Sequence, residues 1–483
     1  MAHGPNGSPS DTTDEARAAR TAGLLVATLA SFFTPFMSSS INIALPSIAR
    51  EFSLDAVTLS WIATSFLLAA AVFVVPFGRL ADIYGRKRIF NVGVVVFTLS
   101  CLSAALSSSG IWLIVSRVFQ GIGSAILAGT SMAILTSVYP AHERGKVLGF
   151  QVAAVYTGLS LGPSIGGILT QAFGWRSIFI FGLPLGVLTM AVTLWKLKGE
   201  WAEAKGEKFD ITGASLFGIS LVALMYGFSK LPQALGVWFL IGGIIGLIGF
   251  VVWEKKAKSP VLDVTLFTSN PVFAFSNLAA LINYMSTSAV TFLLSLYLQY
   301  IKGLTPRNAG LILITQPVMM AVLSPIAGRL SDKVRPRMLA AIGMSITTAG
   351  LLLLTLVHSE TSMVFIVLAL FILGIGFAFF SSPNSNAVMS SVERRYYGVA
   401  SGTLGTMRTV GQMFSMGIAM LLFSIYMGQA EIAPQVYPQF LKSADTGFII
   451  FAVLCFGGVF ASLARQKPNQ ISTPGDVRPT PPS

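Results

Sequence analysis

The sequence predicts an all-α membrane protein of fourteen transmembrane helices, arranged as two six-helix bundles with two helices inserted between them. Three observations predict this fold class. The chain has 483 residues, of which 54% are hydrophobic and only 11% charged, and its mean hydropathy of +0.74 excludes an ordinary cytosolic protein. Fourteen apolar runs have the length of about 20 residues that a helix needs to cross a bilayer. Landmarks of the first half also recur in the second half at a nearly constant offset.

These apolar runs divide the chain into five segments. Residues 1–20 are polar and lack the apolar core of a signal peptide. Residues 21–195 hold the first six runs, 196–268 hold a charged linker and runs seven and eight, and 269–465 hold the last six. Residues 466–483, rich in Pro, Ser and Thr, are predicted to be a disordered tail. The runs are 22–45, 57–79, 89–109, 111–135, 145–170, 175–195, 211–229, 235–253, 271–299, 306–328, 338–358, 362–388, 398–424 and 446–465.

Basic residues are distributed unevenly between alternate loops. With the N-terminus in the cytoplasm, 24 of the 32 Lys and Arg residues are cytoplasmic, six are outside and two lie within apolar runs. Cytoplasmic loops of membrane proteins carry such an excess. We therefore expect a multi-pass monomer in the plasma (inner) membrane with both termini cytoplasmic. The net charge of +13 then reflects topology, and we expect no nucleic-acid partner.

The chain repeats itself. Gly78–Asp82 (Gly-Arg-Leu-Ala-Asp) recurs 250 residues later as Gly328–Asp332 (Gly-Arg-Leu-Ser-Asp), and the Gly-Ile-Gly of 121–123 recurs 253 residues later at 374–376. Two single glycines, Gly145 and Gly158, recur at the second offset as Gly398 and Gly411. Two parallel six-helix halves are typical of a transporter with its site between the halves and rocking-type alternating access.

Three motifs carry a family resemblance, at residues 78–88, 113–123 and 158–167. Over about residues 20–465 the chain resembles the major facilitator superfamily, and within it the fourteen-helix drug:proton antiporters. The resemblance implies a secondary active transporter of the multidrug-efflux type, which exports amphipathic organic compounds with protons as the coupling partner. The third motif is the one that the family associates with export.

The first run departs from this pattern. Relatives carry an Asp nine residues before the Pro of an Ala-Leu-Pro triplet, and that carboxylate is linked to proton coupling and cation recognition. Here the triplet is Ala44-Leu45-Pro46 and the Asp position is Met37. We therefore expect weak or absent proton coupling of the usual kind. The alternative function is a facilitator or importer of a small neutral or anionic organic metabolite.

The loop after the second run is predicted to contribute to gating. Asp82 can accept from a helix N-terminus or from Arg86, four residues on, and such a contact could form in one access state and break in the other. Gly78 and Gly85 allow close helix approach or a turn, and Asp332 is the second copy of the Asp. The alternative is a loop that only anchors topology.

Two arginines are the only basic residues within the apolar runs. An ionisable group in hydrocarbon is costly and usually faces a partner or a water-filled cavity. Arg117 and Arg408 are therefore candidate cavity residues, and a cavity with arginines but no carboxylate would favour neutral or anionic amphiphiles over dications. A purely structural, snorkelling arginine is the alternative. Further candidates are polar side chains in apolar runs, namely Asn42, Asn283, Tyr284, Gln316, Asn384 and Asn386.

Two further patterns lie within helices. The segment 381–386 (Ser-Ser-Pro-Asn-Ser-Asn) is expected to interrupt its helix, and either to line water or substrate or to make helix–helix hydrogen bonds. Gly158, Gly162 and Gly166 form a flat face that permits close packing. With Pro163 and Gly167 they form a candidate hinge between the halves, with packing alone as the alternative.

The sequence does not favour an enzyme. It holds three histidines, no Ser/His/Asp or metal-ligand spacing and no Walker loop. We expect no catalytic residue, metal or cofactor. The expected partners are a small-molecule substrate and the lipid bilayer.

Overall fold

The computed structural model describes residues 9–139, 143–197, 199–257, 259–262, 264–331, 333–393 and 397–464. Within these residues, fourteen helices are long and apolar enough to cross a membrane. Each corresponds to one predicted run, so the predicted fold class is confirmed. The helices are α1 (Pro9–Phe52), α2 (Ala56–Tyr84), α3 (Arg86–Ala105), α4 (Gly110–Val138), α5 (Arg144–Phe173), α6 (Arg176–Lys196), α7 (Ile211–Lys230), α8 (Ala234–Glu254), the short α9 (Thr265–Ser269), α10 (Pro271–Leu296) with a π-helical end (Tyr297–Ile301), α11 (Pro306–Leu313), α12 (Thr315–Ser331), α13 (Pro336–Leu354), α14 (Met363–Ser390), α15 (Tyr397–Tyr426), a 3₁₀ turn (Pro434–Val436) and α16 (Tyr437–Leu463).

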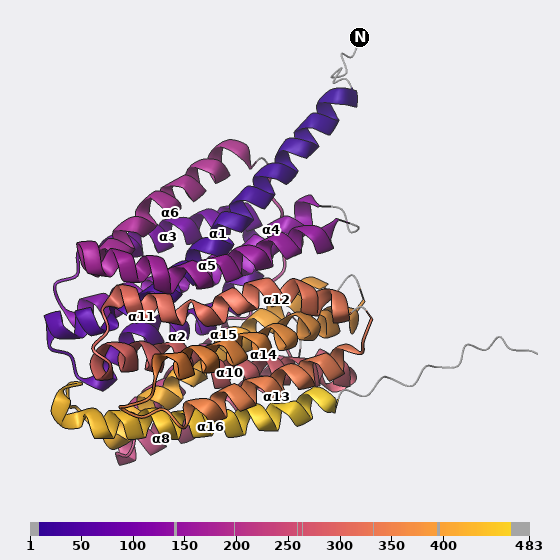
Figure 1. The fold of residues 1–483 in the computed structure, drawn as a ribbon. Helices are drawn as coiled ribbons and strands as arrows, with labels where there is room; N and C mark the ends of the chain where they lie inside the picture. The colour runs from indigo at the N-terminus through magenta and orange to yellow at the C-terminus, as the bar shows by residue number, and fades with distance from the viewer. Residues whose placement is uncertain are drawn as a thin grey trace, which may run out of the picture.

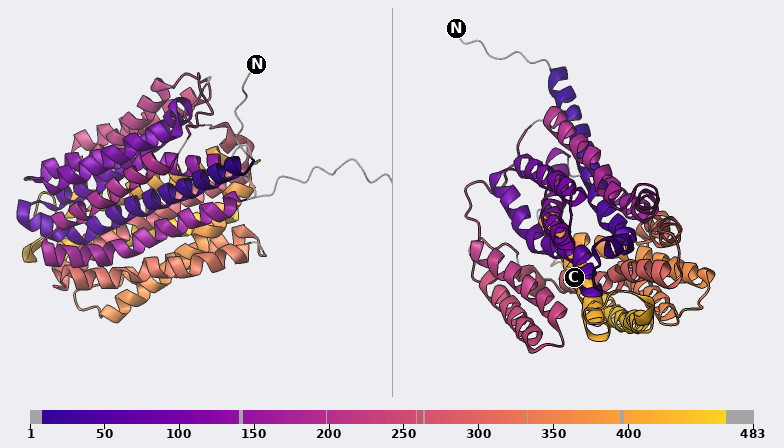
Figure 2. Two further views of the ribbon diagram at one scale, coloured as in Figure 1. Left: turned by 90° about the horizontal axis from the view of Figure 1, so that it is seen from above. Right: turned by 90° about the vertical axis from the view of Figure 1, so that its left-hand side faces the viewer.

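The helices lie side by side in two bundles, with α1–α6 in one and α10–α16 in the other (Figure 1). Viewed along the bundles, the α7–α8 pair lies at one side of both (Figure 2). At the junction between the bundles, α5 packs against α11 and α12, and α2 packs against α15. Helix α7 contacts both α2 and α15.

The internal repeat is visible in how glycines pack. A Cβ on Gly121 would lie within 3.0 Å of the Phe66 carbonyl oxygen, and one on Gly374 within 3.0 Å of the Gln316 carbonyl oxygen. The two glycines are 253 residues apart and their partners 250. Equivalent helix crossings in the two bundles therefore require glycine at equivalent positions, because no Cβ fits between the backbones.

Several helix ends differ from the predicted runs. Helix α1 begins at Pro9, within the polar 1–20 segment, and continues through Pro46 to Phe52. Helix α16 begins at Tyr437 rather than 446, because a helix tolerates polar residues beyond its apolar core. The tail 466–483 lies outside the described residues.

One prediction about helix breaks is wrong. The 381–386 segment does not interrupt its helix, since α14 is continuous through Pro383, and the Ser385 hydroxyl bonds back to the Ser381 carbonyl at 2.8 Å. The break lies instead at Ile314, between α11 and α12. It precedes Pro317, whose ring clashes with the carbonyl four residues earlier.

Candidate functional site

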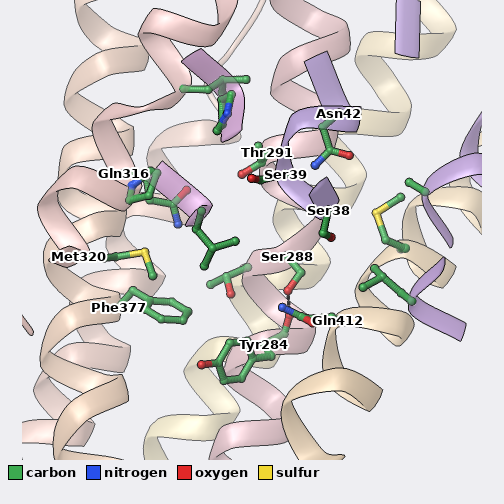
Figure 3. Close-up of a pocket in the computed structure, with 18 of the residues that line it drawn as sticks. Ser38, Ser39, Asn42, Tyr284, Ser288, Thr291, Gln316, Met320, Phe377 and Gln412 are labelled. Atoms are coloured by element: carbon green, nitrogen blue, oxygen red, sulfur yellow. Dashed lines mark hydrogen bonds between the residues drawn. The ribbon is translucent and has the colours of Figure 1, made fainter. Parts of the chain in front are cut away.

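A central cavity lies at the junction of the two bundles. It consists of two adjoining pockets with about 900 and 740 Å³ of empty space, counting the part open to solvent. The side chains that line both pockets join them into one space, and they come from both bundles: Ser38, Leu67, Leu159, Tyr284, Phe377 and Gln412. Figure 3 shows Ser38, Ser39 and Asn42 on one side and Gln316, Met320 and Phe377 on the other.

The walls of this cavity combine apolar side chains with uncharged polar ones and two cations. Arg117 lines the first pocket and Arg408 the second. Among the described residues, no Asp, Glu, Lys or His lines either pocket. A ligand in this cavity therefore meets positive charge without a protein carboxylate.

Arg117 is held by its own bundle. Its side chain is 1% exposed. Its Nε donates to the Ile62 carbonyl oxygen at 3.2 Å, its Nη1 donates to Gln120 Oε1, and its guanidinium lies 4.3 Å from the Phe66 ring centroid. The Gln120 amide in turn contacts the Cys101 thiol at 3.0 Å. These contacts from α2, α3 and α4 give Arg117 a structural setting at the edge of the cavity.

Arg408 lies in a different environment, on α15. Its guanidinium carbon is 5.2 Å from the Tyr284 ring centroid. Its buried Nε has no hydrogen-bond partner among the described residues. No ion pair with a described carboxylate is formed, and the ionisable groups that act on it are the phenols of Tyr284 and Tyr156.

Aromatic side chains form the wall next to Arg408. Tyr284 and Phe377 pack edge to face, with ring centroids 5.3 Å apart, and Tyr156 joins them in the same apolar cluster. The Tyr156 hydroxyl is within 2.7 Å of the Ser381 hydroxyl, across the junction between the bundles. The wall therefore presents ring faces and edges beside one guanidinium.

The structure separates the other predicted cavity residues. Asn42, Tyr284 and Gln316 line the first pocket. Asn283 is fully buried but lines neither pocket, and neither polar atom of its side chain has a hydrogen-bond partner among the described residues. Its i+1 neighbour Tyr284 takes the cavity face instead, because successive helix positions are about 100° apart.

Asn384 and Asn386 also lie away from both pockets. Asn384 is buried, and the Asn386 amide donates to Ser331 Oγ at 3.1 Å. For the 381–386 segment, Asn386 therefore makes a helix–helix hydrogen bond between α14 and α12 and does not line the cavity.

Sequence reasoning missed several residues of the cavity wall, among them Ser38, Tyr156, Phe377 and Gln412. Gln412 follows the repeat glycine Gly411. As a polar residue in an apolar run, it could have been predicted to line the cavity. Phe377 gave no signal, because phenylalanine is equally common in lipid-facing and core positions.

Met37, at the position where relatives carry an Asp, is fully buried in the first bundle. Its sulfur would lie 3.3 Å from a Cβ on Gly182 of α6. It does not line the cavity.

The loop between α2 and α3 holds a second polar centre, around Arg86. Its side chain is 7% exposed, and Nε donates to Asp82 Oδ1 at 2.9 Å. Nη1 and Nη2 donate to the two oxygens of Glu203 at 2.8 and 2.9 Å, and Nη1 also donates to Ser137 Oγ at 2.6 Å. We call this loop and its surroundings the basic end of the molecule.

Glu203 belongs to the linker between α6 and α7, which docks against this loop. The Glu200 carboxylate accepts from the backbone nitrogens of Lys87 and Arg88 at 2.8 and 3.1 Å, and so caps the N-terminus of α3. The Ala204 nitrogen donates to the Asp82 carbonyl oxygen at 3.0 Å. The sequence identified a charged linker but gave no sign of what it contacts.

The two glycines predicted to contribute to gating differ in whether the structure requires glycine at their positions. Gly85 has a φ of 113°, which only glycine adopts freely, and a Cβ there would meet the Glu200 carboxylate. A Cβ on Gly78 would meet nothing within 4 Å. Asp332 lies outside the described residues.

The glycine face of α5 is in close contact with α1. A Cβ on Gly158, Gly162 or Gly166 would lie within 3.0 Å of an α1 atom. Gly167 and the Pro163 carbonyl lie against α11 of the other bundle. The motif therefore provides packing within one bundle and close contact across the junction.

The two bundles are hydrogen-bonded to each other at the end opposite the basic end. The Ala56 nitrogen donates to the Ala430 carbonyl oxygen at 3.1 Å, and the Ser295 hydroxyl donates to the Asn42 carbonyl oxygen at 2.7 Å. No group of three or more His, Cys, Asp or Glu residues that could hold a metal occurs within the described part of the chain.

Comparison with known proteins assigns the fold to a family. A family model described as Major Facilitator Superfamily matches residues 27–260 and 277–482. The chain belongs to the major facilitator superfamily. Members of this superfamily are transporters, so this major-facilitator protein is a transporter rather than an enzyme.

Relatives of this transporter are named for different functions. The riboflavin transporter RibZ of Clostridioides difficile (strain 630) is 30% identical over 447 residues, which cover 91% of this chain and 96% of RibZ. The cephamycin export protein CmcT of Amycolatopsis lactamdurans is 31% identical over 460 residues, which cover 93% of this chain and 94% of CmcT.

A solved structure shares the fold of this transporter. The crystal structure of a bacterial homolog of the human lysosomal transporter Spinster, in an inward-facing and unoccupied conformation, superposes with a TM-score of 0.65. The sequences are 17% identical, and the match covers 93% of this chain and 99% of the other. At this identity the likeness concerns the fold alone.

Proposed function

We propose that this protein is a secondary active transporter that exports amphipathic organic compounds, as a member of the fourteen-helix, multidrug-efflux type. The observation that carries the proposal is the cavity between the bundles, whose walls mix aromatic and aliphatic side chains with a few polar groups. Such pockets suit amphipathic ligands of moderate size. The relative CmcT, an export protein, and the Gly158–Gly167 motif support export.

We further propose a rocker-switch movement of the two bundles around this cavity. The bundles share hydrogen bonds at one end, as between Ala56 and Ala430. Towards the basic end, a Cβ on Gly402 or Gly405 of α15 would meet nothing within 4 Å. With 24 basic residues on the cytoplasmic side against six outside, the basic end faces the cytoplasm of the inner membrane and both termini are cytoplasmic. Near the same end the Ser401 hydroxyl of α15 contacts the Met132 sulfur of α4, so the bundles also meet there.

A second candidate is a facilitator or importer of a small neutral or anionic organic metabolite. Two observations favour it: RibZ is a riboflavin transporter of similar length, and the cavity lacks a carboxylate lining among the described residues. With Met37 buried away from the cavity, we propose weak or absent proton coupling of the usual kind.

Direction of transport separates the two candidates. Intact cells with and without the protein are loaded with a panel of neutral, anionic and dicationic fluorescent amphiphiles, before and after the proton gradient is collapsed. Export predicts that cells lacking the protein accumulate more of at least one compound. If they accumulate less, export is wrong and the import candidate stands. Strong gradient-dependent export of a dication would contradict the proposed weak coupling.

A further inference from the structure

Among the described residues, no carboxylate forms an ion pair with the Arg408 guanidinium. Arg408 lines the second pocket, lies over the Tyr284 ring, and its buried Nε has no hydrogen-bond partner in the part of the chain that the structure describes. Arg408 is half-buried, and a cation that is largely removed from water without a counter-charge is unfavourable. An anion that reached it would gain charge-assisted hydrogen bonds.

Arg117 is less suited to bind an anionic ligand. It lies at the edge of the other pocket, and its Nε and Nη1 already donate to Ile62 and Gln120. These two bonds fix the orientation of the guanidinium, although three of its five N–H groups are not used by them. Protein hydrogen bonds therefore hold the Arg117 guanidinium in place, whereas the Nε of Arg408 has no such bond among the described residues.

The groups around Arg408 define the rest of the ligand. Tyr284 and Phe377 provide an edge-to-face aromatic wall that lines both pockets. Gln412, one helical turn beyond Arg408 on α15, adds an amide that lines both pockets. A flat apolar body can pack against the rings while an acidic group reaches the guanidinium.

We infer that Arg408 is the anion-recognition residue of the cavity, and that its ligand is an aromatic or hydrocarbon body bearing one carboxylate. This inference rests on the proposal that the cavity is the transport site. It names the substrate class that the cavity selects. The carboxylate lies at Arg408 and the apolar body against Tyr284 and Phe377.

A matched set of three probes tests this assignment: 1-naphthaleneacetate, 1-naphthaleneethanol and 1-naphthylmethylammonium. They differ mainly in charge. Their affinities are measured on the purified full-length transporter in lipid nanodiscs by equilibrium dialysis. The wild type should bind the acetate about tenfold or more tighter than the alcohol, and the ammonium weakest, because a hydrogen bond to a charged group is worth about one factor of ten or more.

Single substitutions test whether Arg408 causes the preference for the acetate. Arg408→Gln should weaken acetate binding about tenfold or more and leave the alcohol within about twofold, with Arg408→Lys between them. Arg307→Gln removes an exposed arginine at the far end of the molecule and should change neither affinity. Thermal unfolding without probe checks that each variant is folded.

Several outcomes overturn the inference: equal binding of acetate and alcohol by the wild type, equal loss of both probes in Arg408→Gln, tightest binding of the ammonium, or no binding of any probe. The inference and the proposed function fail separately. Charge-selective binding through Arg408 without export in cells would refute only the proposed export. Export of an anionic amphiphile at unchanged rates by Arg408→Gln would refute only the assignment of Arg408.

Discussion

The two arginines within the membrane-spanning segments have opposite surroundings. Arg117 is 1% exposed and donates to Ile62 and Gln120 of its own bundle, with the Phe66 ring beneath it. Arg408 lies in the other bundle over Tyr284, with its Nε unpaired. The two residues have no arginine counterpart at the repeat offset, so each charge was added to one half only.

The position of an arginine within a membrane helix therefore does not by itself identify it as a ligand-binding residue. Both side chains lie within membrane-spanning segments, where an ionisable group is costly, but Arg117 is buried and Arg408 only half-buried. Arg117 recovers part of that cost from fixed protein groups, which favours one conformation of its bundle. Arg408 recovers less of it, because it lies over the Tyr284 ring but its Nε has no partner among the described residues.

The largest expected effect is on stability, in Arg117→Leu. Loss of the guanidinium leaves the Gln120 Oε1 without its donor and should lower the free energy of unfolding by about 2–3 kcal/mol. Thermal unfolding of purified protein measures the change. The double variant Arg117→Leu/Gln120→Leu should recover part of it, because both polar partners are then absent.

Arg408→Leu is the matched control for that experiment. It removes a buried Nε that has no hydrogen-bond partner among the described residues, so the unfolding temperature should stay unchanged or rise. If Arg117→Leu and Arg408→Leu lowered it equally, the contrast between a satisfied and an unsatisfied arginine would be wrong.

A smaller effect is expected from the glycines that pack α5. Gly158→Ala places a Cβ within 3.0 Å of the Phe32 backbone, and overpacking of this kind costs about 1–3 kcal/mol. The yield of monodisperse protein and its unfolding temperature should both fall. Gly402→Ala on α15 is the control, since a Cβ there meets nothing within 4 Å. Equal behaviour of the two variants would show that α1 and α5 separate easily.

The smallest effect is expected at the linker. Glu203→Gln removes one carboxylate from the buried Arg86, but Asp82 remains bound to it and Glu203 is 69% exposed. Because exposed ion pairs contribute about 1 kcal/mol at most, transport should fall severalfold or less, and the loss should shrink in high salt.

Glu207→Gln gives the comparison for the linker, because its partner Arg79 is more exposed than Arg86. It should leave transport rates within about twofold of wild type. A larger loss in Glu207→Gln than in Glu203→Gln would contradict the view that the linker acts through Arg86.

Much of the fold could be predicted from the sequence. The fourteen spans follow from apolar length, because the bilayer imposes that length locally. The repeat follows from glycines such as Gly121 and Gly374, since close helix crossings exclude a Cβ. The break at Ile314 was missed because prolines have no fixed outcome in a membrane helix: Pro383 is accommodated in α14, whereas the helix before Pro317 ends.

The candidate site could be predicted only in part. Arg117, Arg408, Asn42, Tyr284 and Gln316 line the cavity as polar residues in apolar runs. The same signal was misleading at Asn283, Asn384 and Asn386, because a polar side chain in a membrane helix can face a neighbouring helix as well as a cavity.

The helix count, the two related halves and the presence of two arginines within apolar runs follow from the sequence alone, because each depends on residue type and spacing along the chain. Which of the two arginines is held by protein hydrogen bonds depends on how the helices pack. The partner of Arg117 lies 55 positions away at Ile62, and the Glu203 that holds Arg86 lies 117 positions away. Hydrogen bonds and charge pairs act over a few ångströms in space, so such partners are set by how the helices pack and not by the local sequence.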